Sequence, residues 1–345
     1  MNKKIFMFFI SSILILSACM TRELDTQRDE YQLVIIGSGP AGLTAGIYTA
    51  RSKVDTLLIE GHEPMGLLTE TPSVENWPGY KNISGKDLMK KIYDHAGHAG
   101  CSFLKDSVKA VDFSEKPYKI STYSGKTYKA HSVIIAMGVK RKKLNCPGER
   151  EYWGFGVSAC ATCDAGFYKN KTVVVVGGGN TALVEASHLA HFAKKVYIVH
   201  RSEDFKTFDP IKDIVLQNPK VEAIHNSHVK QIKGEGSGDE RYVTGIEIED
   251  KKEQKTYTIP TDGVFVAIGF LPNTKIFEGQ LEIDKNGYIK RKKASMQTSV
   301  EGVFWAGDIG HRKYQQAIVA AGDGCKAALD CITYLGITLR LALGR

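Results

Sequence analysis

The stretch Tyr31-Gln32-Leu33-Val34-Ile35-Ile36-Gly37-Ser38-Gly39-Pro40-Ala41-Gly42 decides the fold of this chain. Its first six residues are mostly apolar, as in a buried strand, and a GxGxxG turn follows at once. Residues 43–51 then continue as a helix. Glycines permit the tight turn, and the helix N-terminus offers free N–H groups to a pyrophosphate. We therefore predict a dinucleotide-binding unit. Its turn residues are Gly37, Ser38, Gly39, Pro40, Ala41 and Gly42.

The next predicted strand, Thr56–Ile59, ends in Glu60. An acid about 20 residues beyond the glycines is placed to accept a hydrogen bond from a ribose hydroxyl. A GxGxxG turn alone is a weak signal, whereas the same turn between two strands and followed by Glu60 is a strong one. The alternative is a Gly-rich turn without a ligand.

A second unit of the same kind follows. Residues 171–176 form a β-branched run that leads into a GxGxxA turn, and the next strand is Val196–Val199. This strand ends in bases rather than an acid, and a cationic end favours a 2′-phosphate. We therefore expect FAD in the first unit and NADPH in the second. The predicted NADPH contacts are Gly177, Gly179, Asn180, Thr181, His200, Arg201, Ser202 and Lys206.

Two of the seven cysteines, Cys160 and Cys163, form a CxxC pair just before the second unit. No second CxxC or HxxxH completes a zinc site, so no structural metal is expected. Such a pair can close a disulfide or exchange one with a partner. Thiol exchange needs a proton carrier, and Asp164 is the nearest titratable side chain in the sequence.

The remaining elements are predicted from periodicity and turn residues. We expect a helix over 88–97, a hairpin over 118–128, a strand over 132–138 and alternating strands over 221–270. The strand 302–306 leads into Gly307-Asp308, and a helix is predicted from about 315 to 335. Asp308 is placed to accept from a ribitol hydroxyl of FAD; the alternative is that it caps a helix.

The first 19 residues differ from the rest of the chain. Lys3 and Lys4 precede an apolar run of signal-peptide length, and Leu16-Ser17-Ala18-Cys19 resembles a bacterial lipobox. If the lipobox is used, Cys19 is lipidated and a polar tether over 20–30 leads from the membrane to an extracytoplasmic domain. If translation starts at Met20, the protein is cytoplasmic.

Composition limits the function classes. A chain of 345 residues with 43% hydrophobic and 24% charged residues suits about two globular domains. The net charge is +8, with basic runs at 140–143 and 290–293. No aromatic-interleaved reading motif accompanies these runs, so no nucleic-acid partner is expected. An acidic protein partner or a phosphorylated cofactor suits this charge better.

Taken together, these motifs resemble low-molecular-weight bacterial thioredoxin reductases over nearly all of residues 31–337. The resemblance rests on both glycine turns, the CxxC, the stretch 74–79 (VENWPG) and the stretch 302–308 with Gln316-Ala317 after it. It implies an α/β homodimer with two Rossmann-like, three-layer ββα domains, the NADP domain being inserted into the FAD domain. The implied domain segments are 31–147 FAD domain, 148–270 NADPH domain with the CxxC and 271–337 FAD domain; the predicted 1–19 signal and 20–30 tether precede them, and a tail over 338–345 follows.

The resemblance also implies the reaction, from NADPH through FAD to the Cys160–Cys163 disulfide and then to thioredoxin. Cys163 would lie against the flavin, Cys160 would attack the partner, and Asp164 would move the proton. Two alternatives stay open, a related flavoprotein serving another disulfide, peroxidase or ferredoxin partner, and a tethered flavoprotein without turnover. Further FAD contacts implied by the resemblance are Gly66, Leu67, Thr69, Asn76, Gln315, Gln316 and Ala317.

This chain departs from the family pattern at several of these positions. Leu67 replaces a glutamine expected near the flavin, Gln315 replaces an arginine, and Ala165 replaces a glycine. Ser202 and Lys206 replace two arginines of the NADP phosphate site, so one cation is lost and one becomes a point charge. Because the CxxC and the NADP site share a domain and must serve one flavin, we also predict a hinge rotation about linkers near 145–148 and 269–272.

Overall fold

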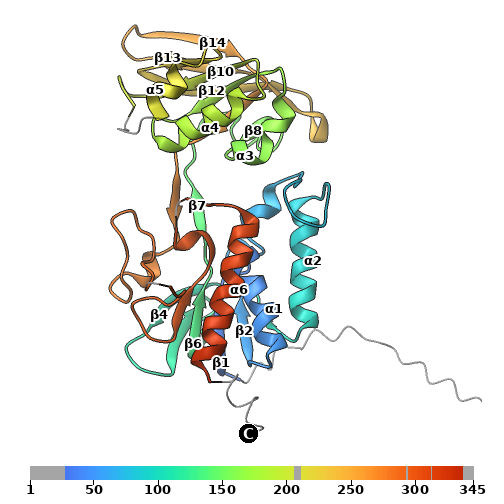
Figure 1. Ribbon diagram of the computed structural model, residues 1–345, viewed down its shortest axis with the longest axis vertical. Coiled ribbons are helices and arrows are strands. Elements are labelled where there is room, and N and C mark those ends of the chain that lie inside the picture. Colours follow the sequence, from blue (N-terminus) through green and yellow to red (C-terminus); the bar gives the residue numbers. More distant parts are fainter. Residues whose placement is uncertain (1–27, 206–210, 293, 312, 337–345) are drawn as a thin grey trace, which may run out of the picture.

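The chain folds into two lobes. The computed structural model describes residues 28–336 apart from 206–210, 293 and 312. One lobe is built from the two ends of this range and the other from its middle, and two strands connect them (Figure 1). The predicted α/β fold, with one sheet domain inserted into another, is confirmed.

The first lobe contains a parallel layer of strands in the order β3-β2-β1-β6-β17. Leu33, Val34 and Ile35 of β1 are fully buried, as expected for a strand covered on both faces. The strands predicted at 31–36 and 56–59 are confirmed. The bounds are β1 (Glu30–Ile36), β2 (Thr56–Ile59), β3 (Ser102–Leu104), β6 (Thr127–Ile135) and β17 (Val303–Trp305).

Strand β6 belongs to two layers. Residues 127–130 pair antiparallel with β5, whereas residues 133–135 pair in parallel with β17. The hairpin predicted over 118–128 and the strand predicted over 132–138 are not separate elements. The second half of the hairpin is continuous with the strand, and β6 ends at Ile135. Burial alternates as far as Ser132 without a turn between the two parts. The antiparallel layer is completed by β4 (Val108–Asp112) and β5 (Tyr118–Thr122).

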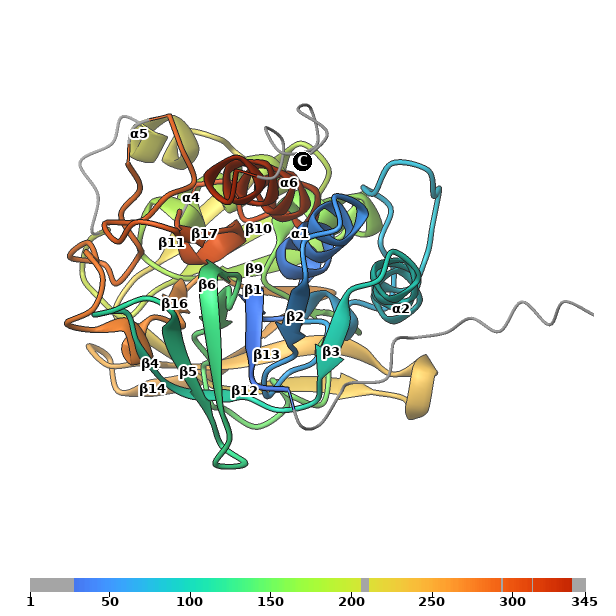
Figure 2. The same ribbon diagram turned by 90° about the horizontal axis from the view of Figure 1, so that it is seen from below.

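Three long helices cover one face of this sheet (Figure 2). The helix predicted from 43 begins at Pro40, whose fixed φ suits the first helical position. The helix predicted from 88 begins at Gly85, because the Ser84 hydroxyl accepts a hydrogen bond from the Asp87 N–H at 3.0 Å. The helices are α1 (Pro40–Arg51), α2 (Gly85–His98) and α6 (Ala317–Tyr334), with short 3-10 turns η1 (Leu67–Glu70), η4 (Lys275–Phe277) and η5 (Gly307–Ile309).

The inserted lobe repeats this plan. A parallel layer runs in the order β11-β10-β9-β15-β8, and an antiparallel layer β12-β13-β14 packs against it. The predicted strand 196–199 and the alternating strands over 221–270 are confirmed. The strands are β8 (Val157–Ser158), β9 (Thr172–Val176), β10 (Lys195–Val199), β11 (Val221–Ile224), β12 (Ser227–Glu235), β13 (Tyr242–Asp250), β14 (Lys255–Pro260) and β15 (Gly263–Val266). The helices are α3 (Ala161–Asp164), η2 (Ala165–Tyr168), α4 (Asn180–Ala190), α5 (Ile211–Leu216) and η3 (Gly238–Glu240).

Two short antiparallel strands, β7 (Val139–Arg141) and β16 (Phe270–Pro272), connect the lobes. The return crossing lies at the predicted linker 269–272. The outward crossing lies earlier than the predicted 145–148, because Leu144 and Cys146 already pack against the core of the inserted lobe. A two-stranded ribbon is a narrow connection with few contacts of its own, so it is a suitable place for one lobe to turn relative to the other.

The same kind of glycine turn follows β1 in the first lobe and β9 in the inserted lobe. Gly37 has a φ of +108°, and a Cβ there would lie 2.5 Å from the carbonyl oxygen of Ala136. Gly177 stands in the same relation to Ala267, whose oxygen would be 2.4 Å from a Cβ. Only glycine allows these close approaches, so the two turns are equivalent parts of a duplicated unit.

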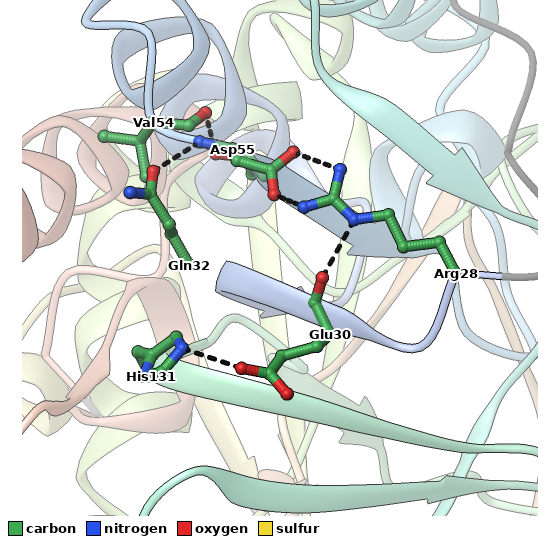
Figure 3. Close-up of polar contacts among 7 residues, drawn as sticks. Arg28, Glu30, Gln32, Val54, Asp55 and His131 are labelled. Carbon is green, nitrogen blue, oxygen red and sulfur yellow. Dashed lines mark hydrogen bonds and ion pairs between the residues drawn. The ribbon is translucent and has the colours of Figure 1, made fainter.

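Polar contacts fasten the point where the described chain enters β1 (Figure 3). The Arg28 guanidinium donates to both carboxylate oxygens of Asp55, and the Asp55 N–H donates to Gln32 Oε1 at 3.0 Å. His131 Nε2 lies 3.1 Å from a carboxylate oxygen of Glu30. Any segment before residue 28 therefore joins a firmly held strand. None of the helices in the described ranges combines the length and apolar character that a membrane span requires.

Candidate active site

A cavity of about 1050 Å³ lies between the two lobes. The first lobe contributes its glycine turn, the loop before α2 and the N-terminus of α6, and the inserted lobe contributes the CxxC and the start of α4. A single cavity therefore joins the first dinucleotide fold to the sulfur pair. The predicted site residues that line it are Gly37, Ser38, Gly39, Pro40, Ala41, Glu60, Gly66, Leu67, Asn76, Cys160, Cys163, Asp164, Asn180, Thr181, Gly307, Asp308, Gln315, Gln316 and Ala317.

The end of the cavity near β2 has the groups that an adenosine ribose needs. Glu60 is buried and accepts a hydrogen bond from the Tyr93 hydroxyl at 2.8 Å. The Ser38 hydroxyl donates to the Glu60 carbonyl at 2.9 Å and accepts from the Met65 N–H at 2.7 Å. Glu60 is thus held in place while its carboxylate stays on the cavity wall.

Further along the wall, buried polar atoms have no partner among the described residues. These are Oδ1 of Asp308 and Nε2 of Gln315. Burial raises the pKa of the Asp308 carboxyl to about 7. Unpaired buried polar atoms are costly and rare, so they indicate a ligand that supplies hydroxyl and carbonyl groups. An FAD molecule extended from the glycine turn to α6 fits this demand.

The Cys160–Cys163 disulfide opens onto the same cavity. The side-chain amide of Gln316, which precedes α6, lies against it. Its Nε2 is 3.8 Å from the Cys160 sulfur and 3.3 Å from the Thr162 hydroxyl, and its Oε1 is 4.0 Å from the Cys163 sulfur. Asn76 Nδ2 lies 3.5 Å from the same Oε1. Gln316 of the first lobe therefore contacts both sulfurs of the inserted lobe.

Asp164 lies at the end of α3, beside the disulfide. Burial raises the pKa of its carboxyl, a Ser158 hydrogen bond opposes that rise, and the charge of Glu75 across the lobes adds to it. Ser158 donates to Asp164 Oδ2 at 2.5 Å and accepts from the Cys160 N–H at 3.0 Å. These two hydrogen bonds connect the Asp164 carboxyl to the backbone of the first cysteine.

One further acid was not identified from the sequence. Glu185 of α4 lines the cavity, and its Oε2 is buried without a partner among the described residues. Burial raises the pKa of Glu185 to about 8; a hydrogen bond from the Ala161 backbone lowers it and the Asp164 charge raises it. The site therefore contains a second acid, beside Asp164, whose pKa is raised by burial. The only sign of Glu185 in the sequence is its position, four residues after Thr181 on α4.

The second dinucleotide turn lies only partly on the cavity. Asn180 and Thr181 line it, whereas Gly177, Gly179, His200, Arg201 and Ser202 do not. The prediction that His200 is one of the bases of a cationic end is wrong. His200 is buried, its ring stacks on Phe205 with centroids 4.3 Å apart, and its Nε2 lies 2.8 Å from His225 Nδ1.

Burial, followed by the charge of His225, lowers the pKa of His200 to about 4. At neutral pH the positive charge of this end therefore comes from the exposed Arg201. Two other predicted contacts also lie off the cavity. Gly42 is buried inside α1, and the Thr69 hydroxyl donates to the Gly66 carbonyl at 2.8 Å. Lys206 and Cys19 lie outside the described residues. No cluster of three metal-ligating side chains occurs within the described ranges.

The fold and the site together define a disulfide oxidoreductase with two dinucleotide-binding domains. The model of the family "Pyridine nucleotide-disulphide oxidoreductase" matches residues 31–324. Thioredoxin reductase of Rickettsia typhi is 45% identical over 305 residues, which is 88% of this chain and 98% of that protein. The chain belongs to this family and, within it, to the thioredoxin reductases.

Two solved structures are also similar. Thioredoxin reductase from Giardia duodenalis is 41% identical and covers 90% of this chain and all of its own, with a TM-score of 0.85. Lactococcus lactis thioredoxin reductase, described as in its FR conformation, is 33% identical and covers 89% of this chain and 99% of its own, with a TM-score of 0.60.

Proposed function

We propose that this chain is an FAD-dependent thioredoxin-disulfide reductase that takes electrons from NADPH. The observation that carries the proposal is the disulfide opening onto the cavity of the FAD-type fold, with the Gln316 amide against both sulfurs. Bound FAD would accept a hydride from NADPH and pass two electrons to a disulfide. The direct test is whether the purified protein is yellow and reduces thioredoxin with NADPH. A colourless protein, or one inactive with thioredoxin, contradicts the proposal.

The residues of the chain divide the remaining work. The glycine turn, Glu60 and Asp308 would hold FAD, and Gln316 would keep the sulfur pair in place. Once Cys160–Cys163 is reduced to a dithiol, the Cys160 thiolate attacks a thioredoxin sulfur to form a mixed disulfide. Cys163 then attacks Cys160, which releases dithiol thioredoxin and restores the disulfide. Asp164 supplies the proton that the leaving sulfur requires.

The nucleotide donor is the point at which this chain departs most from its family pattern. With His200 neutral and Ser202 in place of an arginine, few cations remain for a 2′-phosphate. We therefore expect S202R to lower the KM for NADPH about tenfold, because a charge-assisted hydrogen bond to phosphate is gained. Steady-state rates with NADPH and NADH in parallel measure this. The KM for NADH is the control, and an equal fall in both constants contradicts the phosphate assignment.

We also infer that the two lobes change their relative orientation during turnover. The CxxC lies against the FAD-type fold here, so a nicotinamide held by the same inserted lobe needs a second arrangement. Both solved relatives cover about 90% of the chain, yet the TM-score falls from 0.85 to 0.60. Such a fall is expected when similar domains are placed differently.

A disulfide between the lobes tests this inference. A Cβ on Gly154 would lie 3.0 Å from Pro72 of the other lobe. In the variant P72C/G154C, oxidation should therefore join the lobes and stop turnover, and a reductant that opens the new bond should restore it. The two single variants are the controls. Unchanged activity in the joined protein would exclude a required rotation.

Two further parts of the proposal concern assembly and location. A homodimer is supported by exposed apolar side chains on the packed pair α1 and α6, namely Tyr48, Ile318 and Leu329. Light scattering should then give twice the mass of the chain. A membrane tether through lipidated Cys19 rests on residues outside the described ranges. Mass spectrometry of the mature N-terminus decides it, and an unmodified Met20 or Thr21 would exclude it.

A further inference from the structure

Arg141 joins three parts of the molecule. It is the last residue of β7, in the ribbon between the lobes. Its guanidinium donates to the Glu70 carboxylate at the end of η1, in the first lobe. The Cζ atom of the same guanidinium lies 4.2 Å from the ring centroid of Trp153, in the inserted lobe. One side chain therefore contacts both lobes from the ribbon that joins them.

The burial of this guanidinium shows that the two contacts are substantial. The Arg141 side chain is only 16% exposed, whereas that of Glu70 is 49% exposed. A guanidinium enclosed to this degree needs a charge partner and is well suited to stack on an aromatic ring. Cation–π stacking and a partly buried ion pair each contribute modestly, so their sum is enough to bias two arrangements of similar energy.

The two partners of Arg141 lie on different lobes, which the β7 and β16 ribbon connects at this point. Beside Trp153, Gly154 abuts Pro72, which lies two residues after Glu70. A turn of the inserted lobe about β7 and β16 would therefore carry Trp153 away from Glu70. Arg141 could then keep one partner but not both, so we expect the bridge to be lost when the inserted lobe turns away from the arrangement that presents the disulfide to the cavity.

We propose that Arg141 is a positioning residue that favours the disulfide-facing arrangement by bridging Glu70 and Trp153. This inference rests on the proposed function, because it assumes that the lobes alternate. The bridge slows the rotation that takes the inserted lobe out of this arrangement and favours the rotation that returns it. Loss of the bridge should therefore speed the reduction of the flavin by NADPH and slow the reduction of the disulfide by the flavin. A general loss of structure would not change these two rates in opposite directions.

The test uses the FAD-loaded full chain mixed with one equivalent of NADPH in a stopped-flow spectrophotometer. A first phase reports loss of flavin absorbance as NADPH reduces it, and a second reports its return as the Cys160–Cys163 disulfide is reduced. In R141M and E70Q we expect the first phase to be about three- to tenfold faster and the second slower by a similar factor. The double variant should match R141M alone. K142M, which removes a neighbouring charge without a bridge, should behave as wild type.

A measurement without turnover accompanies these rates. The disulfide of P72C/G154C should form more slowly when R141M is added, because the lobes spend less time in the arrangement that brings the two positions together. Phases that both slow, or that stay as in wild type, overturn the bridge, as does K142M acting like R141M. If wild type shows no NADPH-driven phase at all, the proposed function fails instead. E70Q alters an accessible side chain, so an unstable R141M would not remove the test.

Discussion

Replacing Cys160 with serine should abolish thioredoxin reduction while NADPH still reduces the flavin. We expect C160S to lower the rate with thioredoxin by at least about 10³-fold, because a serine hydroxyl does not ionise at neutral pH and cannot attack a disulfide. The dinucleotide folds do not depend on this sulfur, which lies before α3 on the cavity wall. Flavin reduction by NADPH should therefore persist.

The companion variant C163S separates the roles of the two sulfurs. With Cys160 free and Cys163 absent, attack on thioredoxin should proceed but release should not, so a mixed disulfide should accumulate on non-reducing gels. C160S should give no such species. C146S, which changes a half-buried free thiol of the inserted lobe, is the matched control and should stay active. If C160S traps thioredoxin and C163S does not, the two roles are exchanged.

Much of the architecture follows from short local patterns. The turns at Gly37 and Gly177 can be recognised from the sequence because only glycine permits their close approach to Ala136 and Ala267. Strand Thr172–Val176 is readable because its last four residues are buried on both faces and are all valine. The long strand β6 is predicted as two separate elements, because its residue pattern changes from alternating to fully apolar where it passes from one layer to the other.

The site was predictable where chemistry depends on sequence neighbours, and not where it depends on tertiary contacts. Cys160, Cys163 and Asp164 lie close together in the sequence, so their pattern is visible in the chain. Glu185 matters because folding buries it near Asp164, and its position four residues after Thr181 does not by itself reveal that burial. His200 shows the converse, since a histidine beside an arginine suggests charge until its burial against His225 is known.

The second large effect is expected from Asp164, through the proton it holds. D164N keeps the shape of the side chain and can still accept from Ser158, but it carries no transferable proton. General acid–base groups contribute about 10²- to 10⁴-fold to rate, so thioredoxin reduction should fall by about 10²-fold or more. Burial raises the pKa of Asp164, so it stays protonated further toward neutral pH than an ordinary aspartate. Wild-type activity should decline as pH rises through this pKa, and D164N should lack that decline.

The same shift has a consequence for stability that does not depend on catalysis. Because the folded state holds the Asp164 proton more tightly than the unfolded state, wild type loses folding free energy as pH rises from near 3.8 through the raised pKa. The loss is at most about 1.4 kcal/mol per pH unit, and it is absent in D164N. Denaturant unfolding of the oxidised protein at several pH values should therefore show D164N gaining on wild type as the pH rises. D94N, which changes an exposed carboxylate on α2, should follow wild type in rate and in stability. A D164N protein that keeps full activity, or one whose stability relative to wild type does not change with pH, would remove Asp164 from the role of buried proton donor.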